Sequence, residues 1–163
     1  SQDKLNKLES EFGSINIEYI LSTPDSIKKA VANSDLVIGA VYVVGKEAPK
    51  VVTIDMLQDM KPGTVMVDIS IDQGGCFESS KPTTHDSPTF LVNDVVHYCV
   101  TNMPGAVPLT ATEALNKATL PYILELANNG IKKALDENSH LQNGLNTLNG
   151  RAVHPGVIEA LSK

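Results

Sequence analysis

Short apolar stretches recur along the first hundred residues of the chain. Four of them are nearly continuous apolar runs of strand length, and a fifth alternates apolar and polar residues as an edge strand does. The four runs are residues 35–41, 64–69, 89–92 and 95–100, and the alternating stretch is 15–19. We expect residues 35–41 to be buried on both faces of a parallel sheet.

Helix signals lie between these stretches. Residues 3–13 place three apolar side chains on one face and end on a glycine. A second helix is predicted after residues 22–25, where a capping residue, a proline and an acid follow one another. A short third helix is predicted with Thr53 as its cap. Strands that alternate with helices predict an α/β fold, with a parallel sheet and flanking helices.

The pattern changes after Pro108. Residues 110–129 are compatible with one long helix, in which Pro121 is expected to cause a kink because proline lacks an amide donor. A second helical stretch begins at Gly130, and a short one covers residues 155–161. We therefore predict a domain boundary near Pro108.

Composition narrows the class of protein. With 163 residues, 42% of them apolar and 20% charged, the chain can bury a core and form one domain, or one domain plus part of another. Its net charge of −6 and its dispersed basic residues argue against nucleic-acid or anionic-membrane partners. No apolar run approaches the roughly 20 residues of a membrane span. Cys76 and Cys99 are too far apart for a redox or zinc pair, so we expect buried thiols and a cytoplasmic location.

Residues 67–78 are the most informative segment. An apolar strand leads there to Asp72 and then to Gly74 and Gly75. Since ligands of open α/β sheets bind at the carboxyl ends of the strands, Asp72 is the first catalytic candidate. The alternative is an ordinary turn aspartate. The glycines would let the backbone approach a ligand closely, or they belong to an ordinary loop.

Three segments together carry a family resemblance: Val67–Glu78, Pro82–His85 and Asn102–Pro108. They resemble the alanine dehydrogenases. No G-x-G-x-x-G turn occurs in the chain. The resemblance therefore implies the C-terminal part of a longer enzyme. Residues 1–107 would form an incomplete Rossmann-like NAD-binding domain without its first strand and glycine-rich turn, and residues 108–163 would form helices of the substrate domain.

The resemblance also implies a reaction. Members of this family carry out the reversible oxidative deamination of L-alanine to pyruvate and ammonium, with hydride transfer to NAD. Asp72 would face the nicotinamide and the substrate, where its carboxylate stabilises the cationic imine. Such enzymes are commonly cytoplasmic homo-hexamers. This stretch alone is expected to be inactive, because the amides that cradle the pyrophosphate are absent.

Thirteen cofactor contacts follow from the same resemblance. Three of these residues have an alternative structural interpretation: Ser22 as a helix cap, Lys4 as a solvated surface lysine and Val41 as a core residue. Lys81 stands where family members often have arginine, and a lysine cannot reproduce a planar two-pronged contact. The full set is Lys4, Ser22, Val41, Tyr42, Ile69, Ser70, Ile71, Asp72, Lys81, Val100, Thr101, Asn102 and Met103.

The remaining polar residues yield weaker candidates. The family's catalytic histidine and its substrate-binding lysine and arginine lie upstream of this sequence, so His85 is not assigned to that role, and His97 is expected in a core or crevice. Glu125 and Asn129 are one helical turn apart, but solvated polarity is the preferred interpretation, and no metal is predicted.

Two alternative functions remain open. One is the nucleotide-binding subunit of a proton-translocating transhydrogenase, which residues 48–50 and 61–63 also resemble. The run of Asp72 to Cys76 disfavours it, because that relative diverges at this position. The other alternative is a non-catalytic binding or assembly module.

Overall fold

The computed structural model describes residues 1–13, 15–44 and 46–162. The chain divides into two compact units. The first, the sheet unit, comprises Ser1–Val41 and Ala48–Thr101, and the second, the helical unit, comprises Tyr42–Glu47 and Asn102–Lys163. The predicted boundary between residues 107 and 108 stays a prediction.

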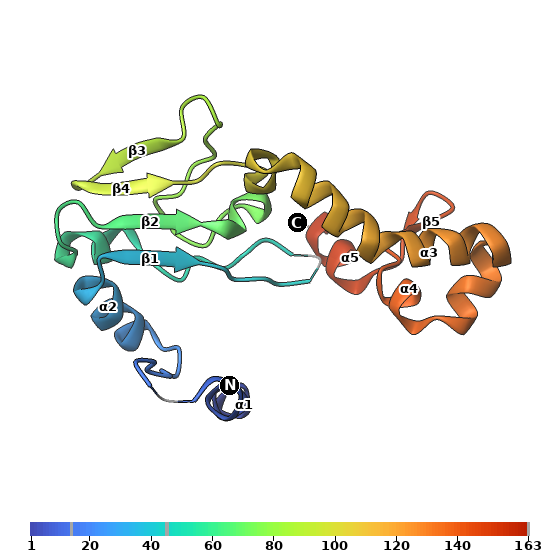
Figure 1. Ribbon diagram of the computed structural model, residues 1–163, viewed down its shortest axis with the longest axis horizontal. Coiled ribbons are helices and arrows are strands. Elements are labelled where there is room, and N and C mark those ends of the chain that lie inside the picture. Colours follow the sequence, from blue (N-terminus) through green and yellow to red (C-terminus); the bar gives the residue numbers. More distant parts are fainter. Residues whose placement is uncertain (14, 45, 163) are drawn as a thin grey trace. The chain divides into compact units, whose positions relative to one another are not determined.

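Four strands form the sheet unit's single sheet, in the order β1-β2-β4-β3 (Figure 1). Strands β1, β2 and β4 run parallel, whereas β3 is antiparallel to β4. Asn93 and Asp94 join these two strands with positive φ values of 51° and 60°, as a two-residue hairpin turn requires. The strands are β1 Leu36–Gly39, β2 Val65–Asp68, β3 Thr89–Val92 and β4 Val95–Tyr98. The predicted α/β fold with a largely parallel sheet is confirmed.

One strand prediction is wrong. Residues 15–19 form a turn and an irregular segment, in which Asn16 has a φ of 60°. Alternation alone does not make a strand, because a strand also needs a neighbour that satisfies its backbone. The run 35–41 does form a strand, β1, but the expectation that it is buried on both faces is not met in this chain. Strand β1 lies at the sheet edge, and Leu36 and Ile38 are 55% and 58% exposed.

The predicted helices of the sheet unit are present. Helix α1 spans Gln2–Phe12 and ends at Gly13, whose φ is 71°. Helix α2 spans Pro24–Asn33, and Thr23 and Ser26 form a reciprocal capping box at its start. The 3-10 helix η1 spans Ile54–Asp59. Thr53 occupies its cap position without a side-chain bond, and the carboxylate of Glu78 instead accepts from the Ile54 amide at 2.8 Å.

The core of the sheet unit lies against one face of the sheet. Its members come from α2, β2, β4, the segment from residue 48 to residue 60, which includes η1, and the loop after β2, and both cysteines are buried as predicted. Gly39 of β1 is required by this packing, because a Cβ there would lie 2.4 Å from Cys76 Sγ and 2.6 Å from Phe77 Cζ. The buried cluster is Val31, Ala48, Val52, Met56, Leu57, Met60, Met66, Cys76, Phe77 and Val95.

The helical unit is built around one long helical segment, α3, which spans Pro108–Glu137. Gly130 breaks it with φ 73° and ψ 160°, so the second helical stretch begins where the sequence predicts. The break in α3 is at Gly130 and not at Pro121, where the sequence predicted a kink. Within α3, Gly130 alone has non-helical dihedral angles. Smaller elements follow: η3 Met103–Ala106 before α3, then α4 Ser139–Asn143, β5 Thr147–Leu148, β6 Arg151–Ala152 and α5 Pro155–Leu161.

The β5–β6 hairpin was missed by the sequence analysis. Its turn is Asn149-Gly150, with φ values of 50° and 78°. Asn-Gly is the strongest short signal for such a turn, but the flanking strands of two residues each are too short to show a period. Within the described parts of the chain, no helix is long and apolar enough to cross a membrane.

Candidate functional site

The candidate site begins where β2 ends. Strand β2 terminates at Asp68, and the chain continues into the 3-10 helix η2, Ile69–Gln73. Gly74 and Gly75 follow with φ values of 87° and 74°, which only glycine adopts at low cost. We call residues 69–80 the site loop. It presents Asp72 as an exposed side chain at the carboxyl end of the sheet.

A buried carboxylate holds the site loop from inside. Asp68 has no exposed surface. One of its oxygens accepts from the Ser70 amide at 3.0 Å, and the other accepts from the Cys76 amide at 2.8 Å and the Phe77 amide at 3.3 Å. The Ser80 hydroxyl donates to the second oxygen at 2.5 Å. Such a satisfied buried carboxylate ties both ends of the loop to β2.

The glycines are fitted to this carboxylate. A Cβ on Gly75 would lie 2.8 Å from an Asp68 oxygen and 2.9 Å from Ser80 Cβ. The left-handed backbone and the close approach therefore both require glycine at this position. The two glycines were predicted as site residues from the sequence but Asp68 was not, although a carboxylate that ends an apolar strand was a visible signal.

Ser70 connects the site loop to the segment after β1. Its hydroxyl accepts from the Val41 amide at 2.8 Å and donates to the Val41 carbonyl at 2.9 Å. Ser70 is 7% exposed and Ile71 is 4% exposed, whereas Ile69 is 53% exposed. The side chains of Ile69 and Asp72 are thus the predicted contacts on this loop that reach solvent.

Residues 48–52 lie alongside residues 73–78. The Ala48 amide donates to the Gln73 carbonyl at 2.9 Å, and the Val51 amide donates to the Cys76 carbonyl at 2.8 Å. The Lys50 ammonium donates to the carbonyls of Gly74 and Gly75. The Gln73 side-chain oxygen is buried and has no hydrogen-bond partner among the described residues. Hydrogen bonds to its backbone carbonyls thus also hold the site loop in place.

A neutral histidine attaches the end of the loop to β4. His97 is fully buried, and its Nδ1–H donates to the Val95 carbonyl at 3.0 Å. Nε2 therefore accepts from the Ser79 hydroxyl at 2.7 Å. Burial lowers the pKa of His97, with the Lys81 charge as a further cause. The prediction of a core position for His97 is confirmed, and its neutral ring stacks on Phe90 with centroids 4.9 Å apart.

The two cysteines are inert thiols rather than nucleophiles. Burial raises the pKa of Cys76 to about 11, and the neighbouring Asp68 charge adds to the effect. Burial also raises the pKa of Cys99. Because the thiolate is the reactive form, neither residue is set up for covalent chemistry near neutral pH.

The structure also places four other predicted cofactor contacts of the sheet unit. Lys81 lies 4.4 Å above the Phe90 ring centre, a cation–π contact. Val100 is fully buried, backbone and side chain together. Ser22 is exposed and is not the cap of α2, since Thr23 fills that position. Lys4 is an exposed residue of α1.

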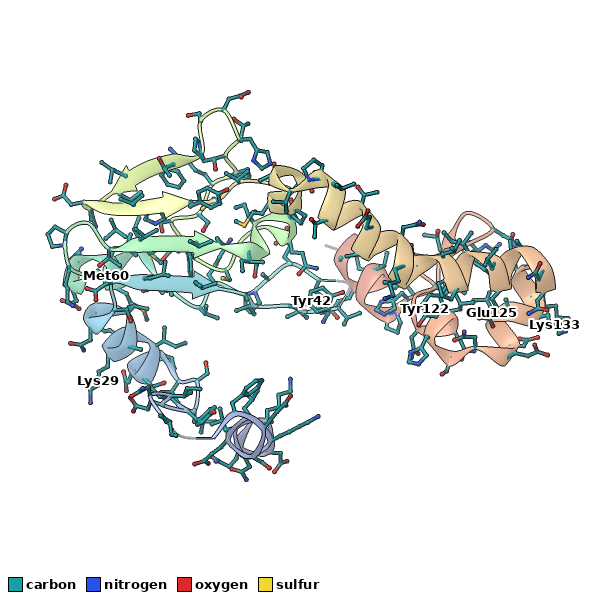
Figure 2. The ribbon with its side chains drawn as sticks, in the orientation of Figure 1. Lys29, Tyr42, Met60, Tyr122, Glu125 and Lys133 are labelled. Carbon is teal, nitrogen blue, oxygen red and sulfur yellow. The ribbon has the colours of Figure 1, made fainter. Side chains whose placement is uncertain are left out.

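Tyr42, Asn102 and Met103 belong to the helical unit. Tyr42 is 70% exposed (Figure 2), which fits the expectation that it is not a core residue. Asn102 has a left-handed backbone, φ 52°, and precedes η3. A largely apolar pocket of about 580 Å³ lies here, lined by Asn102, Pro104, Gly105, Pro108, Ala111, Thr112 and Leu115.

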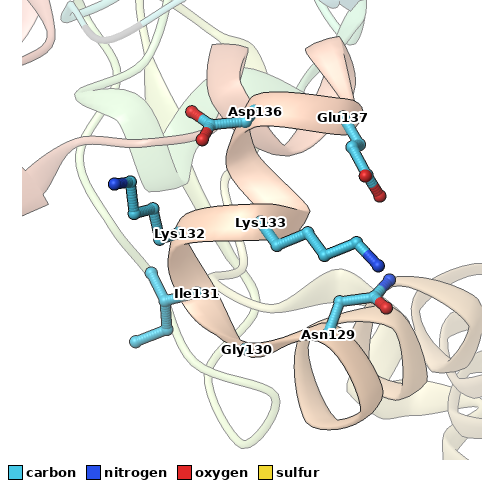
Figure 3. A pocket seen from close by; sticks show the side chains of 7 residues that line it. All are labelled: Asn129, Gly130, Ile131, Lys132, Lys133, Asp136 and Glu137. Atoms are coloured by element: carbon cyan, nitrogen blue, oxygen red, sulfur yellow. The ribbon is translucent and has the colours of Figure 1, made fainter.

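A second pocket of the helical unit surrounds the break at Gly130. Its volume is about 510 Å³, and Asn129 and Lys133 point toward one another across its rim (Figure 3). Glu125 is not available for the cation site considered from sequence, because its carboxylate accepts from the Asn138 amide group at 2.7 Å. Among residues 1–13, 15–44 and 46–162, no group of three or more acidic, histidine or cysteine side chains could hold a metal ion.

Comparison with known proteins agrees with this architecture. The family model described as "Alanine dehydrogenase/PNT, C-terminal domain" matches residues 1–155. An alanine dehydrogenase of Halomonas elongata is 57% identical over 88% of this chain, and one of Staphylococcus saprophyticus is 52% identical over 98%. The chain spans only 39% and 43% of the lengths of these two relatives.

Solved structures give the same result. An L-alanine dehydrogenase superimposes with a TM-score of 0.82 at 48% identity, over 99% of this chain and 44% of that one. A transhydrogenase from Sinorhizobium meliloti superimposes with a TM-score of 0.67 over 91% of this chain and 40% of that one; at 23% identity, this match shows a shared fold alone. The chain belongs to the alanine dehydrogenase/PNT family and corresponds to the C-terminal domain of that family.

Proposed function

We propose that this chain is part of an NAD-dependent L-alanine dehydrogenase, which converts L-alanine reversibly to pyruvate and ammonium. Membership of the family and the identity to enzymes named alanine dehydrogenase support the proposal. One observation of the structure carries it. Asp72 is exposed on a loop that Asp68 and Lys50 hold from two sides at the carboxyl end of a parallel strand.

Asp72 would be the catalytic residue. In the proposed reaction a nicotinamide cofactor supplies the hydride acceptor for the Cα hydrogen of alanine. The carboxylate of Asp72 would stabilise the cationic imine that forms on the substrate and orient the water that attacks it. A rigid loop suits this role, because preorganised charge needs no rearrangement during the reaction.

The fit of the cofactor is supported by the shape of the site loop. Gly74 has a left-handed backbone and brings bare backbone to the surface beside Asp72, whereas Gly75 is buried against Asp68. We propose that Ile69, Ser70, Ile71, Asp72, Val100, Thr101, Asn102 and Met103 contact the nicotinamide side, and that Lys4, Ser22, Val41, Tyr42 and Lys81 contact the rest of the dinucleotide. Ser70 would contribute backbone, since its hydroxyl is engaged with Val41.

Further features of the whole protein belong to the same proposal. Residues 1–107 would be the C-terminal part of the NAD-binding domain and residues 108–163 would return to the substrate domain. The active assembly would be a cytoplasmic homo-hexamer. The 163 residues alone would turn over negligibly, because the chain contains no glycine-rich phosphate-binding turn.

The test compares a full-length protein carrying this sequence with its Asp72→Asn variant. We expect the wild type to form NADH from NAD when L-alanine is added, followed by the absorbance of NADH. The variant should keep its affinity for NAD and lose most turnover, by about a hundredfold or more. Parallel assays with NADP decide the cofactor. If the Asp72→Asn variant were as active as the wild type, Asp72 would be an ordinary turn residue and not a catalytic one.

Two outcomes would favour the alternatives. A full-length protein that binds NAD but leaves L-alanine untouched would favour the binding or assembly module. Hydride exchange between NADH and an oxidised NADP analogue, without any use of alanine, would favour a transhydrogenase-like protein. Robust turnover by the 163-residue chain would contradict the proposed dependence on residues outside it.

A further inference from the structure

Four successive carbonyls of the site loop accept hydrogen bonds from one short segment. Ala48, Lys50 and Val51 donate to the carbonyls of residues 73–76. The first and last of these bonds are between backbones, from the Ala48 and Val51 amides. The two in the middle come from the side chain of Lys50, whose ammonium donates to the Gly74 carbonyl and, at 2.8 Å, to the Gly75 carbonyl.

The sequence explains why a side chain serves the middle of this ladder. Pro49 has no amide hydrogen, so the backbone cannot donate there. Gly74 and Gly75 are both left-handed, and their carbonyls therefore do not alternate in direction as those of a strand do. A lysine ammonium has three donors on a flexible stem and can reach two such carbonyls at once.

The bonds from Lys50 complete the restraint on the turn after Asp72. Asp68 fixes the amides of Ser70, Cys76 and Phe77 from inside the unit. The Gly74 and Gly75 amides donate to the Ile71 and Ser70 carbonyls, at 3.1 and 3.0 Å, so Lys50 supplies the partners of the two glycine carbonyls. Without Lys50 these carbonyls would lose those bonds at two glycines, the residues with the greatest backbone freedom. Asp72 lies two residues before the first of them. The backbone that carries its carboxylate would then sample more conformations.

We propose that Lys50 is a positioning residue, which holds the Gly74-Gly75 turn so that Asp72 keeps its catalytic orientation. This inference rests on the proposed function of Asp72. Lys50 affects the catalytic rate through the position of Asp72. A small displacement of a catalytic group lowers the rate of the reaction more than it weakens substrate binding. Its role is distinct from that of Lys81, whose ammonium lies over the Phe90 ring.

The kinetic test uses a full-length protein carrying Lys50→Met, with Lys50→Arg as the conservative variant. Lys28→Met is the matched control, because Lys28 is an exposed lysine of the same unit that pairs with Asp59. We expect kcat of Lys50→Met to fall about tenfold to a hundredfold, with KM for alanine and for NAD within about threefold of wild type. Lys50→Arg should recover part of the rate, and Lys28→Met should resemble wild type. A kcat of Lys50→Met within about twofold of wild type would overturn the proposal.

Hydrogen exchange of the peptide covering residues 69–78 separates this inference from the proposed function. The measurement needs no turnover, so it tests the restraint even if the protein does not oxidise alanine. Faster exchange in Lys50→Met than in Lys28→Met supports the restraint. Unchanged exchange combined with a lower kcat would overturn positioning, since Lys50 would then act on the reaction directly. If Lys50→Met does not fold, the same comparison is made with Lys50→Arg, for which exchange and rate should change together; a change in one alone contradicts the proposal.

Discussion

The sheet unit and the helical unit differ in how their sequences are held in place. The sheet unit buries a continuous apolar cluster and fixes its site loop by hydrogen bonds to Asp68, Lys50 and His97. Among the described residues of the helical unit, Ala134 and Gly156 alone are buried, although α3 is the longest element of the chain. Tyr122 and Glu125 lie along this helix (Figure 2), and apolar residues such as Leu115 and Ile123 remain 65% and 56% exposed.

This difference separates local from long-range stabilisation. A helix satisfies its own backbone, so α3 can form from local sequence, but most helical stability in proteins comes from packing of an apolar face. The site loop consists of short irregular backbone that could not keep its shape without side-chain partners. We therefore expect substitutions in the sheet unit to cost more than comparable ones in the helical unit.

The largest effect is expected from Asp68→Ala. It leaves the buried amides of Ser70, Cys76 and Phe77 without an acceptor. The free energy of unfolding should fall by about 3 kcal/mol or more, measured by urea denaturation. Asp59→Ala, which removes one partner of an exposed ion pair in the same unit, is the control and should change little. Equal stability of the two variants would mean that Asp68 does not organise the loop.

A pair of glycine substitutions compares the two units directly. Gly75 and Gly150 have similar φ values, 74° and 78°, but a Cβ would meet Asp68 and Ser80 at Gly75 and nothing within 4 Å at Gly150. Gly150→Ala should cost about 1–2 kcal/mol, for the backbone alone. Gly75→Ala should cost roughly 2–4 kcal/mol, because overpacking is added. Thermal or urea unfolding measures both, and equal costs would contradict the tight packing around Asp68.

The smallest effect is a pH dependence from His97. Because burial lowers its folded pKa below the ordinary value of 6.5, the unfolded chain binds a proton that the folded chain does not. Stability is therefore fully present above pH 6.5 and falls as the pH drops below it, by at most about 1.4 kcal/mol per pH unit. Unfolding between pH 5 and 7.5 tests this, with His97→Gln as the variant that should flatten the dependence. His140→Gln, an exposed site of the helical unit, should leave it unchanged.

Much of the local structure could be predicted from the sequence. The glycine end of α1, the cap of α2, the two runs that became β3 and β4 and the break at Gly130 all depend on residues within a few positions of one another. Backbone preference acts at that range, so local pattern suffices. The same reasoning failed for residues 15–19, where alternation was present but the described backbone forms no strand.

The α/β alternation and the position of Asp72 and the two glycines after an apolar strand can be read from the residues alone. How that loop is held depends on the fold. Asp68 accepts hydrogen bonds from residues that follow it by 2 to 12 positions in the sequence. Lys50 donates to carbonyls 24 and 25 positions after it. Neither set of contacts leaves a periodic signal, because each depends on which segments the fold brings side by side. The edge position of β1 was decided in the same way, by pairing rather than by the apolar character of its residues.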